Sequence, residues 1–333
     1  VLLEPMSRLI DRYSVVVVAV AATLWATDAY FRNQLVKHLT PSEIVVMEDA
    51  LVALFLLPVL IRSLGEVRKL RARGWLAVIA IAAGAQALAT ILFTKSFSYG
   101  IYSETFVLQQ TQPLIAIVLA WIMLGERRRP WFWAAVAVAL VAVYMVVQAP
   151  NISLGRPFAP IASLTGGRLD AGLYALGAAA LWAGGTVFGR YALGSISFWS
   201  MTSLRFTVAL PILLAVVLLS PGEGFAGFSH YTFNDFVPNL LGIALIPGLL
   251  ALLLYYRALS KTPASLATIA EMAFPVAATL IAAAPPPWGF QQQIFPAQIV
   301  GTILLLGVIL FLGWTKEKTP PVLQARPVEL TAG

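Results

Sequence analysis

Length, composition and charge place the chain in a membrane. Of its 333 residues, 59% are hydrophobic and 11% are charged, whereas soluble domains carry about 25% charged residues. The formal net charge is +7, but the basic residues form short clusters between apolar stretches, a pattern typical of membrane topology signals rather than of a nucleic-acid partner. The sequence has no cysteine, which excludes disulfides and cysteine-bound zinc, and we expect no metal site.

Ten apolar stretches are long enough to cross the hydrocarbon core, which requires about 20 helical residues. The sequence therefore predicts an all-α polytopic membrane protein with ten transmembrane helices. The expected spans are 14–34, 42–61, 75–95, 102–124, 131–148, 171–190, 197–219, 236–257, 264–283 and 295–314.

The distribution of Lys and Arg predicts the orientation of these spans. If the first span starts in the cytoplasm, sixteen of the 22 basic residues fall on the cytoplasmic side and five on the other. Arg205 remains inside a span. Cytoplasmic loops of membrane proteins are enriched in Lys and Arg, so we expect both termini in the cytoplasm and the protein in the cell (inner) membrane, surrounded by lipid.

A long loop rich in Pro and Gly, residues 149–170, separates five spans from five. Because five is odd, a repeat of the first half would enter the membrane upside down, which is the arrangement of inverted-repeat transporters. The expected organisation is an N-terminal five-helix repeat at 1–148, an external linker at 149–170, a C-terminal five-helix inverted repeat at 171–314 and a cytoplasmic tail at 315–333.

Residues in the two halves correspond at two nearly equal offsets. These pairs are Trp25 with Trp182, Glu48 with Arg205, Gln109 with Glu271, and Pro113 with Pro275. With the basic run after Leu124, Gly125 and Glu126, this pattern resembles the drug/metabolite transporter superfamily, in its EamA-like branch. The resemblance implies a central cavity between the halves, alternating access and no use of ATP, but no particular substrate.

The resemblance has one visible departure. Where the first half has Leu124, Gly125 and Glu126, the second half has the sequence Pro-Pro-Pro-Trp at 285–288. A shared role for the acidic residue in both halves is therefore not implied, and we expect Glu126 to serve a cytoplasmic turn.

Polar residues inside the first span have two interpretations each. Asp28 and Arg32 are four residues apart and share a helix face, so Asp28 is either a cavity site for a proton or amine, or a neutralised partner of Arg32 near the outer interface. Trp25 and Trp182 either stack on a flat substrate or act as interfacial anchors.

Charges near the middle of spans are costly and often functional. Glu48 and Arg205 either form a salt bridge between the halves that breaks in one access state, or pair locally, Glu48 with Arg32 for instance. Arg205 is alternatively a fixed cation for a substrate carboxylate or phosphate.

The ninth span carries the strongest candidate for substrate binding or coupling, Glu271. Pro275 cannot donate to the carbonyl of Glu271, so a free carbonyl and a carboxyl group fall at one depth, suited to a cation, an amine or a proton. The fourth span repeats this geometry with Gln109, Gln112 and Pro113. The glutamines are alternatively hydrogen-bonding partners between helices.

The sequence thus predicts a secondary active transporter, in the exporting direction, for a small organic metabolite such as an amino acid or a drug-like amine. The alternatives are a facilitator or exchanger of an anionic or phosphorylated metabolite that uses Arg205 and, remotely, an intramembrane enzyme. We expect no catalytic residues and no cofactor, possible coupling to protons, and a monomer or homodimer.

Overall fold

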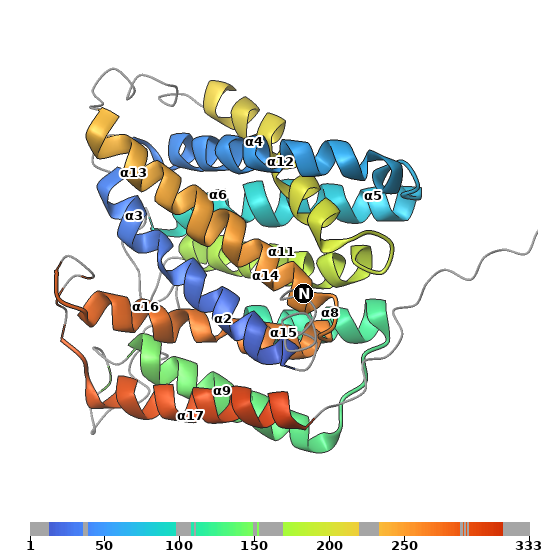
Figure 1. The fold of residues 1–333 in the computed structure, drawn as a ribbon. Helices are drawn as coiled ribbons and strands as arrows, with labels where there is room; N and C mark the ends of the chain where they lie inside the picture. The colour runs from blue at the N-terminus through green and yellow to red at the C-terminus, as the bar shows by residue number, and fades with distance from the viewer. Residues whose placement is uncertain are drawn as a thin grey trace, which may run out of the picture.

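We describe the fold from a computed structural model of the full chain. The described residues are 13–35, 39–97, 108–109, 111–148, 152, 169–219, 233–286, 289, 291 and 293–315. Within these ranges the regular structure is helical throughout (Figure 1). The predicted tail at 315–333 apart from its first residue, nearly all of the linker at 149–170, and residues 102–107 and 110 of the fourth span lie outside them.

Eight helices in the described part are long and apolar enough to cross a membrane, and two further apolar helices are shorter, Gln112–Leu124 and Pro296–Leu312. The helices of the first half are α2 (Ser14–Ala26), α3 (Asp28–Leu35), α4 (Pro41–Val67), α5 (Ala72–Ile79), η1 (Ala80–Leu88), α6 (Ala89–Phe97), α8 (Gln112–Leu124) and α9 (Pro130–Gln148). Those of the second half are α11 (Leu169–Ala192), α12 (Phe198–Leu219), α13 (Phe233–Ile243), η5 (Ala244–Leu250), α14 (Ala251–Leu259), α15 (Ala264–Glu271), α16 (Ala273–Ala283) and α17 (Pro296–Trp314).

Several spans change helical geometry within the bilayer. The third span of each half contains a π-helical stretch, η1 and η5. The first span passes from α2 to α3 at Thr27, and the ninth passes from α15 to α16 at Met272. Such interruptions are frequent at functional sites and are tolerated at membrane depth where protein or a water-filled cavity surrounds them.

Packing between the halves arranges the helices around the centre of the bundle. Helix α4 packs on α12, and α9 lies beside α17 at the bottom of Figure 1. Helix α11 contacts η1, α6 and α8, while α2 contacts α14, α15 and α16. Helices from opposite halves are therefore neighbours throughout.

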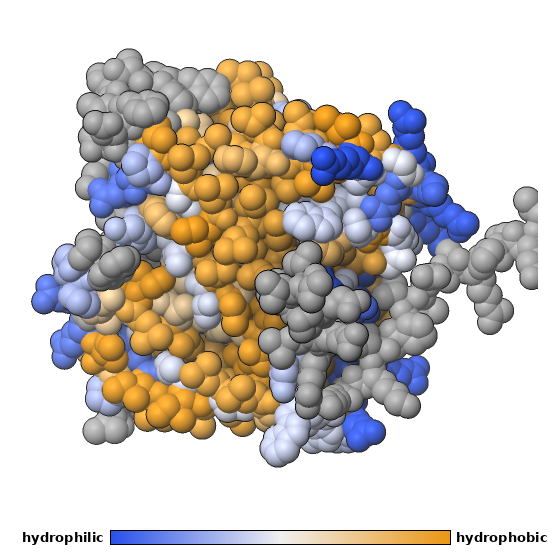
Figure 2. Space-filling model, in the orientation of Figure 1, coloured by the Kyte–Doolittle hydropathy of each residue, from blue (hydrophilic) through white to orange (hydrophobic). Residues whose placement is uncertain are grey.

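The surface carries the apolar side chains that a bilayer requires. Figure 2 shows a broad hydrophobic face. Hydrophilic groups gather toward its two edges, where the helices in Figure 1 end. Large apolar side chains such as Leu54, Ile122 and Leu219 are 63%, 69% and 81% exposed. Exposure on this scale is costly in water and favourable against lipid, which agrees with a multi-pass membrane protein.

Candidate functional site

A cavity of about 560 Å³ lies between helices of both halves, within the usual range for small-molecule sites, about 300–1,000 Å³. Eight residues singled out from the sequence line it: Trp25, Gln109, Gln112, Pro113, Trp182, Arg205, Glu271 and Pro275. Asp28 and Glu48 are not among its lining residues. The predicted site residues thus divide into a cavity group and a separate pair.

The two prolines lie where helices are interrupted. Helix α15 ends at Glu271 and α16 begins two residues later, with Pro275 in its first turn. Helix α8 begins at Gln112, followed by Pro113, a position where the missing N–H costs nothing. Both interruptions bring polar side chains to the cavity at the end of a helix.

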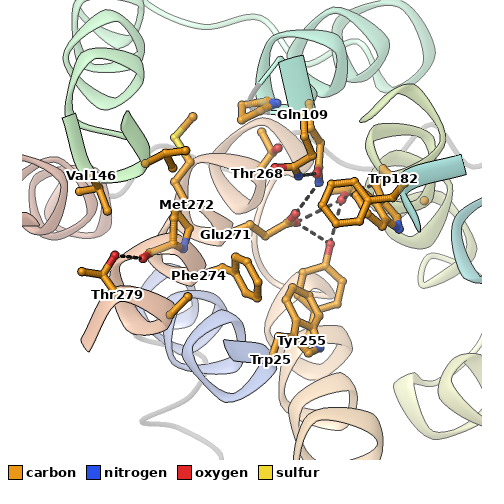
Figure 3. Close-up of a pocket in the computed structure, with 18 of the residues that line it drawn as sticks. Trp25, Gln109, Val146, Trp182, Tyr255, Thr268, Glu271, Met272, Phe274 and Thr279 are labelled. Carbon is orange, nitrogen blue, oxygen red and sulfur yellow. Dashed lines mark hydrogen bonds between the residues drawn. The ribbon is translucent and has the colours of Figure 1, made fainter. Parts of the chain in front are cut away.

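Glu271 is the centre of a hydrogen-bonded cluster in the cavity wall (Figure 3). Its Oε1 accepts from Tyr255 Oη at 2.8 Å and from Thr186 Oγ1 at 3.1 Å, and its Oε2 accepts from Gln112 Nε2 at 3.0 Å. Gln112 Oε1 in turn accepts from Gln109 Nε2 at 3.1 Å. Glu271 forms no salt bridge with a described residue, so neutral donors alone hold the carboxyl group.

Thr268 lies one turn before Glu271 and also lines the cavity. Its Oγ1 is buried and has no hydrogen-bond partner among the described residues. An unpaired buried hydroxyl costs about 1–3 kcal/mol, and because the atom is itself buried, a solute could reach it only after a movement of the cavity wall.

Aromatic rings from both halves form the walls. Trp25 lies against Tyr255 with ring centroids 5.1 Å apart, and Phe93 meets Trp182 edge-on at 5.0 Å. The Trp182 indole is oriented because its Nε1 donates to the carbonyl of Ala85 at 3.0 Å. The rings therefore offer partly fixed apolar faces to a solute.

Close approach of α11 to η1 depends on a glycine in the cavity wall. A Cβ added to Gly185 would lie 2.6 Å from the Cβ of Ala85, well inside contact distance. Only glycine lets the two helices meet at this separation, which also sets the position of the neighbouring Trp182.

Arg205 reaches the cavity but is not paired with Glu48. Its Nε donates to Gln86 Oε1 at 2.7 Å and its Nη1 to Tyr256 Oη at 2.9 Å. Glu48 instead pairs with Arg32 at 3.2 Å, and Arg32 also donates to both carboxylate oxygens of Asp28, at 2.6 and 2.7 Å. Of the two alternatives for Glu48, the structure has the local pair, because Arg32 lies within reach of both acids.

Glu126 joins the two halves outside the cavity, which is more than the expected role in a turn. Its carboxylate accepts from the backbone N–H groups of Ala264 and Ser265, at 2.8 and 3.0 Å, and from Ser265 Oγ at 2.6 Å. Arg128 pairs with the same carboxylate at 3.1 Å and donates to Ser265 Oγ at 2.6 Å. The loop after α8 therefore caps the first turn of α15, the helix that ends at Glu271.

A second carboxylate of the first half caps another helix of the second half. Glu66, in the last turn of α4, accepts from the backbone N–H and hydroxyl of Ser197 and from the hydroxyl of Ser200. These groups begin α12. Glu66 and Glu126 thus each bind the start of a helix in the other half.

Sequence reasoning missed Phe93 and Thr186, which complete the cavity, and Asp49 and Gln86, which lie behind it. Thr186 follows Trp182 by one helical turn, and that spacing places both on one face. Asp49 is a second acid directly after Glu48 in a predicted span, which was a usable signal. Gln86 is a polar residue inside the predicted third span, which was a signal of the same kind, whereas Phe93 carries none in one sequence.

An interior cavity within a bundle of apolar helices, with aromatic walls and a few convergent polar groups, is typical of a small-molecule site in a membrane protein. The EamA-like transporter family model matches the chain twice, over residues 12–148 and 171–314. The chain therefore belongs to the EamA-like transporter family.

Two curated relatives are also transporters. The riboflavin transporter ImpX of Fusobacterium nucleatum is 27% identical over 282 residues, covering 79% of this chain and 86% of the relative. The uncharacterized transporter YwfM of Bacillus subtilis is 25% identical over 223 residues, covering 66% and 67%. Among the solved structures, a protein crystal structure matches with a TM-score of 0.67 at 15% identity, covering 91% of this chain and 99% of that one, which indicates a shared fold.

Proposed function

We propose that the chain is a secondary transporter that carries a small, flat organic solute through the central cavity by alternating access. The observation that carries this proposal is the composition of the cavity: aromatic rings from both halves surround a hydrogen-bonded carboxyl group, Glu271. A flat solute stacks on the rings, while the carboxyl and amide groups bind its polar edge.

Within that class, a heteroaromatic solute or an aromatic amine fits better than an aliphatic amino acid. Trp25, Phe93 and Trp182 supply apolar faces for stacking on a flat ring system. The relative named as a riboflavin transporter supports riboflavin as the first solute to test. As expected from the sequence, we propose export as the direction of transport.

In the proposed mechanism, the two matched segments are inverted repeats of five transmembrane spans each, ten in all. The protein lies in the inner membrane of the cell, with both termini in the cytoplasm. Rocking of one repeat against the other opens the cavity to each side in turn. The Glu66 and Glu126 contacts are suited to break in this movement, because each joins one half to a helix start of the other. We further propose that the protein works as a monomer or a homodimer surrounded by membrane lipid.

Coupling to protons is proposed at Glu271. Its carboxyl group lies in the cavity and is held by neutral donors, so a proton and an amine would compete for the same oxygens. Exchange of one for the other would link solute movement to a proton gradient without any cofactor.

A second candidate function follows from Arg205. Its guanidinium lines the cavity and bonds to Gln86 and Tyr256, both neutral. An anionic solute, carboxylate or phosphate, would find a fixed cation there, and the protein would then be a facilitator or exchanger of an anionic metabolite.

Thermal unfolding of the purified protein tests the proposal and distinguishes the two candidates. A ligand that binds the native state raises its apparent stability. We expect riboflavin to raise the unfolding temperature of the wild type. The rise should be smaller for Glu271→Gln and close to the wild-type rise for Arg205→Lys. A rise produced only by anionic metabolites and lost in Arg205→Ala would favour the second candidate.

A further inference from the structure

Behind the cavity wall, Asp49 is a buried acid that the proposed transport mechanism does not use. It lies in α4, is 0% exposed, and faces the interior of the bundle. Its Oδ1 accepts from Gln86 Nε2 at 3.0 Å, while its Oδ2 has no hydrogen-bond partner among the described residues. A buried carboxylate oxygen without a donor is costly, which leaves this atom in need of a proton or a ligand.

The amide of Gln86 links Asp49 to the cavity. Arginine has only donors, so the Gln86 atom that accepts from Arg205 Nε at 2.7 Å is the amide oxygen. The amide nitrogen must then face Asp49 and donate to it. The charge of Asp49 is thus transmitted through one polarised amide to the guanidinium that lines the cavity.

The surrounding charges leave one negative charge uncompensated. The charged groups that act on Asp49 are Glu48 of α4, Arg32 of α3 and Arg205 of α12. The described helices η1 and η5 contribute no titratable side chain to this region, and Asp28 is bound to Arg32. Three carboxyl groups therefore share two guanidinium groups. Arg205 also acts on the cavity acid Glu271, so a single added proton makes the group neutral when Glu271 is protonated.

We propose that Asp49, Gln86 and Arg205 form a second proton-binding site, in which a proton on Asp49 Oδ2 frees the charge of Arg205 to act on the solute in the cavity. With Asp49 ionised, its negative charge holds Arg205 through Gln86. With Asp49 protonated, the bond from Gln86 to Oδ1 persists but loses its charge assistance, and Arg205 becomes the stronger partner for an anionic group. The step moves one proton and breaks no covalent bond.

The role of this proton-binding site in transport rests on the proposed function, but proton binding at Asp49 can be measured without a solute. Infrared difference spectroscopy of the purified protein during a pH titration detects the C=O stretch of protonated carboxyl groups and, in the same spectra, changes in guanidinium bands. At pH values above the range in which exposed carboxyl groups titrate, we expect wild-type carboxyl bands from Asp49 and from Glu271. The Asp49 band, identified by difference from Asp49→Asn, should correspond to about one proton per chain and be accompanied by a guanidinium change.

Asp49→Asn should remove this carboxyl band, and Asp49→Glu should keep it at a shifted position, which covers the case in which the first variant does not fold. Glu43→Gln is the matched control, since Glu43 lies on the same helix in its N-terminal capping box, which glutamine also supports. The band should also persist in Glu271→Gln, which separates Asp49 from the cavity acid.

Gln86→Leu tests the link to the cavity. This variant should keep a shifted carboxyl band but lose the accompanying guanidinium change, and Arg205→Lys should lose that change as well. A titrating band that is unchanged in Asp49→Asn, or a guanidinium change that persists in Gln86→Leu, overturns the proposal. If the band behaves as expected while no solute binds, the proton site stands and the proposed transport function is in error.

Discussion

Glu271→Gln is the substitution that probes the cavity most sharply, because the two side chains have nearly the same shape. The carboxylate accepts three hydrogen bonds, from Tyr255, Thr186 and Gln112. Glutamine keeps an oxygen for Tyr255 and Thr186, but it presents an N–H group to the donor of Gln112. The variant loses one favourable contact and the negative charge at the polar end of the cavity.

The size of the effect follows from these contacts. A hydrogen bond to a charged group contributes about 1.5–3 kcal/mol, and each 1.4 kcal/mol corresponds to a tenfold change in affinity. If the solute donates one hydrogen bond to Glu271, we expect the Kd of Glu271→Gln to rise by about 10-fold to about 150-fold.

Tryptophan fluorescence provides the assay, because Trp25 and Trp182 both line the cavity. Riboflavin bound there should quench their emission, and a titration gives the Kd for the wild type and the variant. Glu43→Gln, a carboxyl-to-amide change outside the cavity, serves as the control. A folded Glu271→Gln protein with wild-type affinity would refute the assignment of Glu271 to the solute site.

Three further substitutions test the structure around the cavity. Trp182→Ala should weaken riboflavin binding by about fivefold to about 150-fold in the same titration, since aromatic stacking contributes about 1–3 kcal/mol per base-like ring. Unchanged quenching in that variant, apart from the lost signal of Trp182 itself, would place the solute elsewhere. Gly185→Ala should lower the free energy of unfolding by about 1–3 kcal/mol, because the new methyl group overlaps Ala85, and equal stability by chemical denaturation would show that α11 and η1 are farther apart. Glu126→Ala removes the acceptor of two backbone N–H groups and leaves Arg128 buried without its acid; we expect a loss of about 2–4 kcal/mol, and a neutral result would mean that the contact between the halves is not stabilising.

Much of the helical arrangement could be predicted from hydropathy, because lipid leaves long apolar helices as the main solution for a spanning chain. The expected spans agree with the helices of the described part to within a few residues at most ends. The break at Met272 was indicated by Pro275, which removes a backbone donor. The π-helical stretch at 80–88 was not indicated, since its sequence contains no proline and reads as ordinary helix.

The candidate site was only partly predictable, for a geometric reason. A polar residue in a span signals a functional environment, and this reasoning found Glu271, Arg205 and the two tryptophans that lie around the cavity. It could not determine direction: adjacent residues Glu48 and Asp49 point about 100° apart on the helix, so one meets Arg32 and the other Gln86. Only the packing of α4 against its neighbours settles which partner each acid has.

The central claim, that a flat aromatic solute crosses through the cavity around Glu271, is tested most directly by riboflavin uptake into proteoliposomes. The account predicts saturable, protein-dependent uptake that responds to a pH gradient in the wild type and in Glu43→Gln, and that is lost in a folded Glu271→Gln protein. Uptake no faster than in protein-free liposomes, or pH-driven uptake of wild-type size in Glu271→Gln, would contradict it.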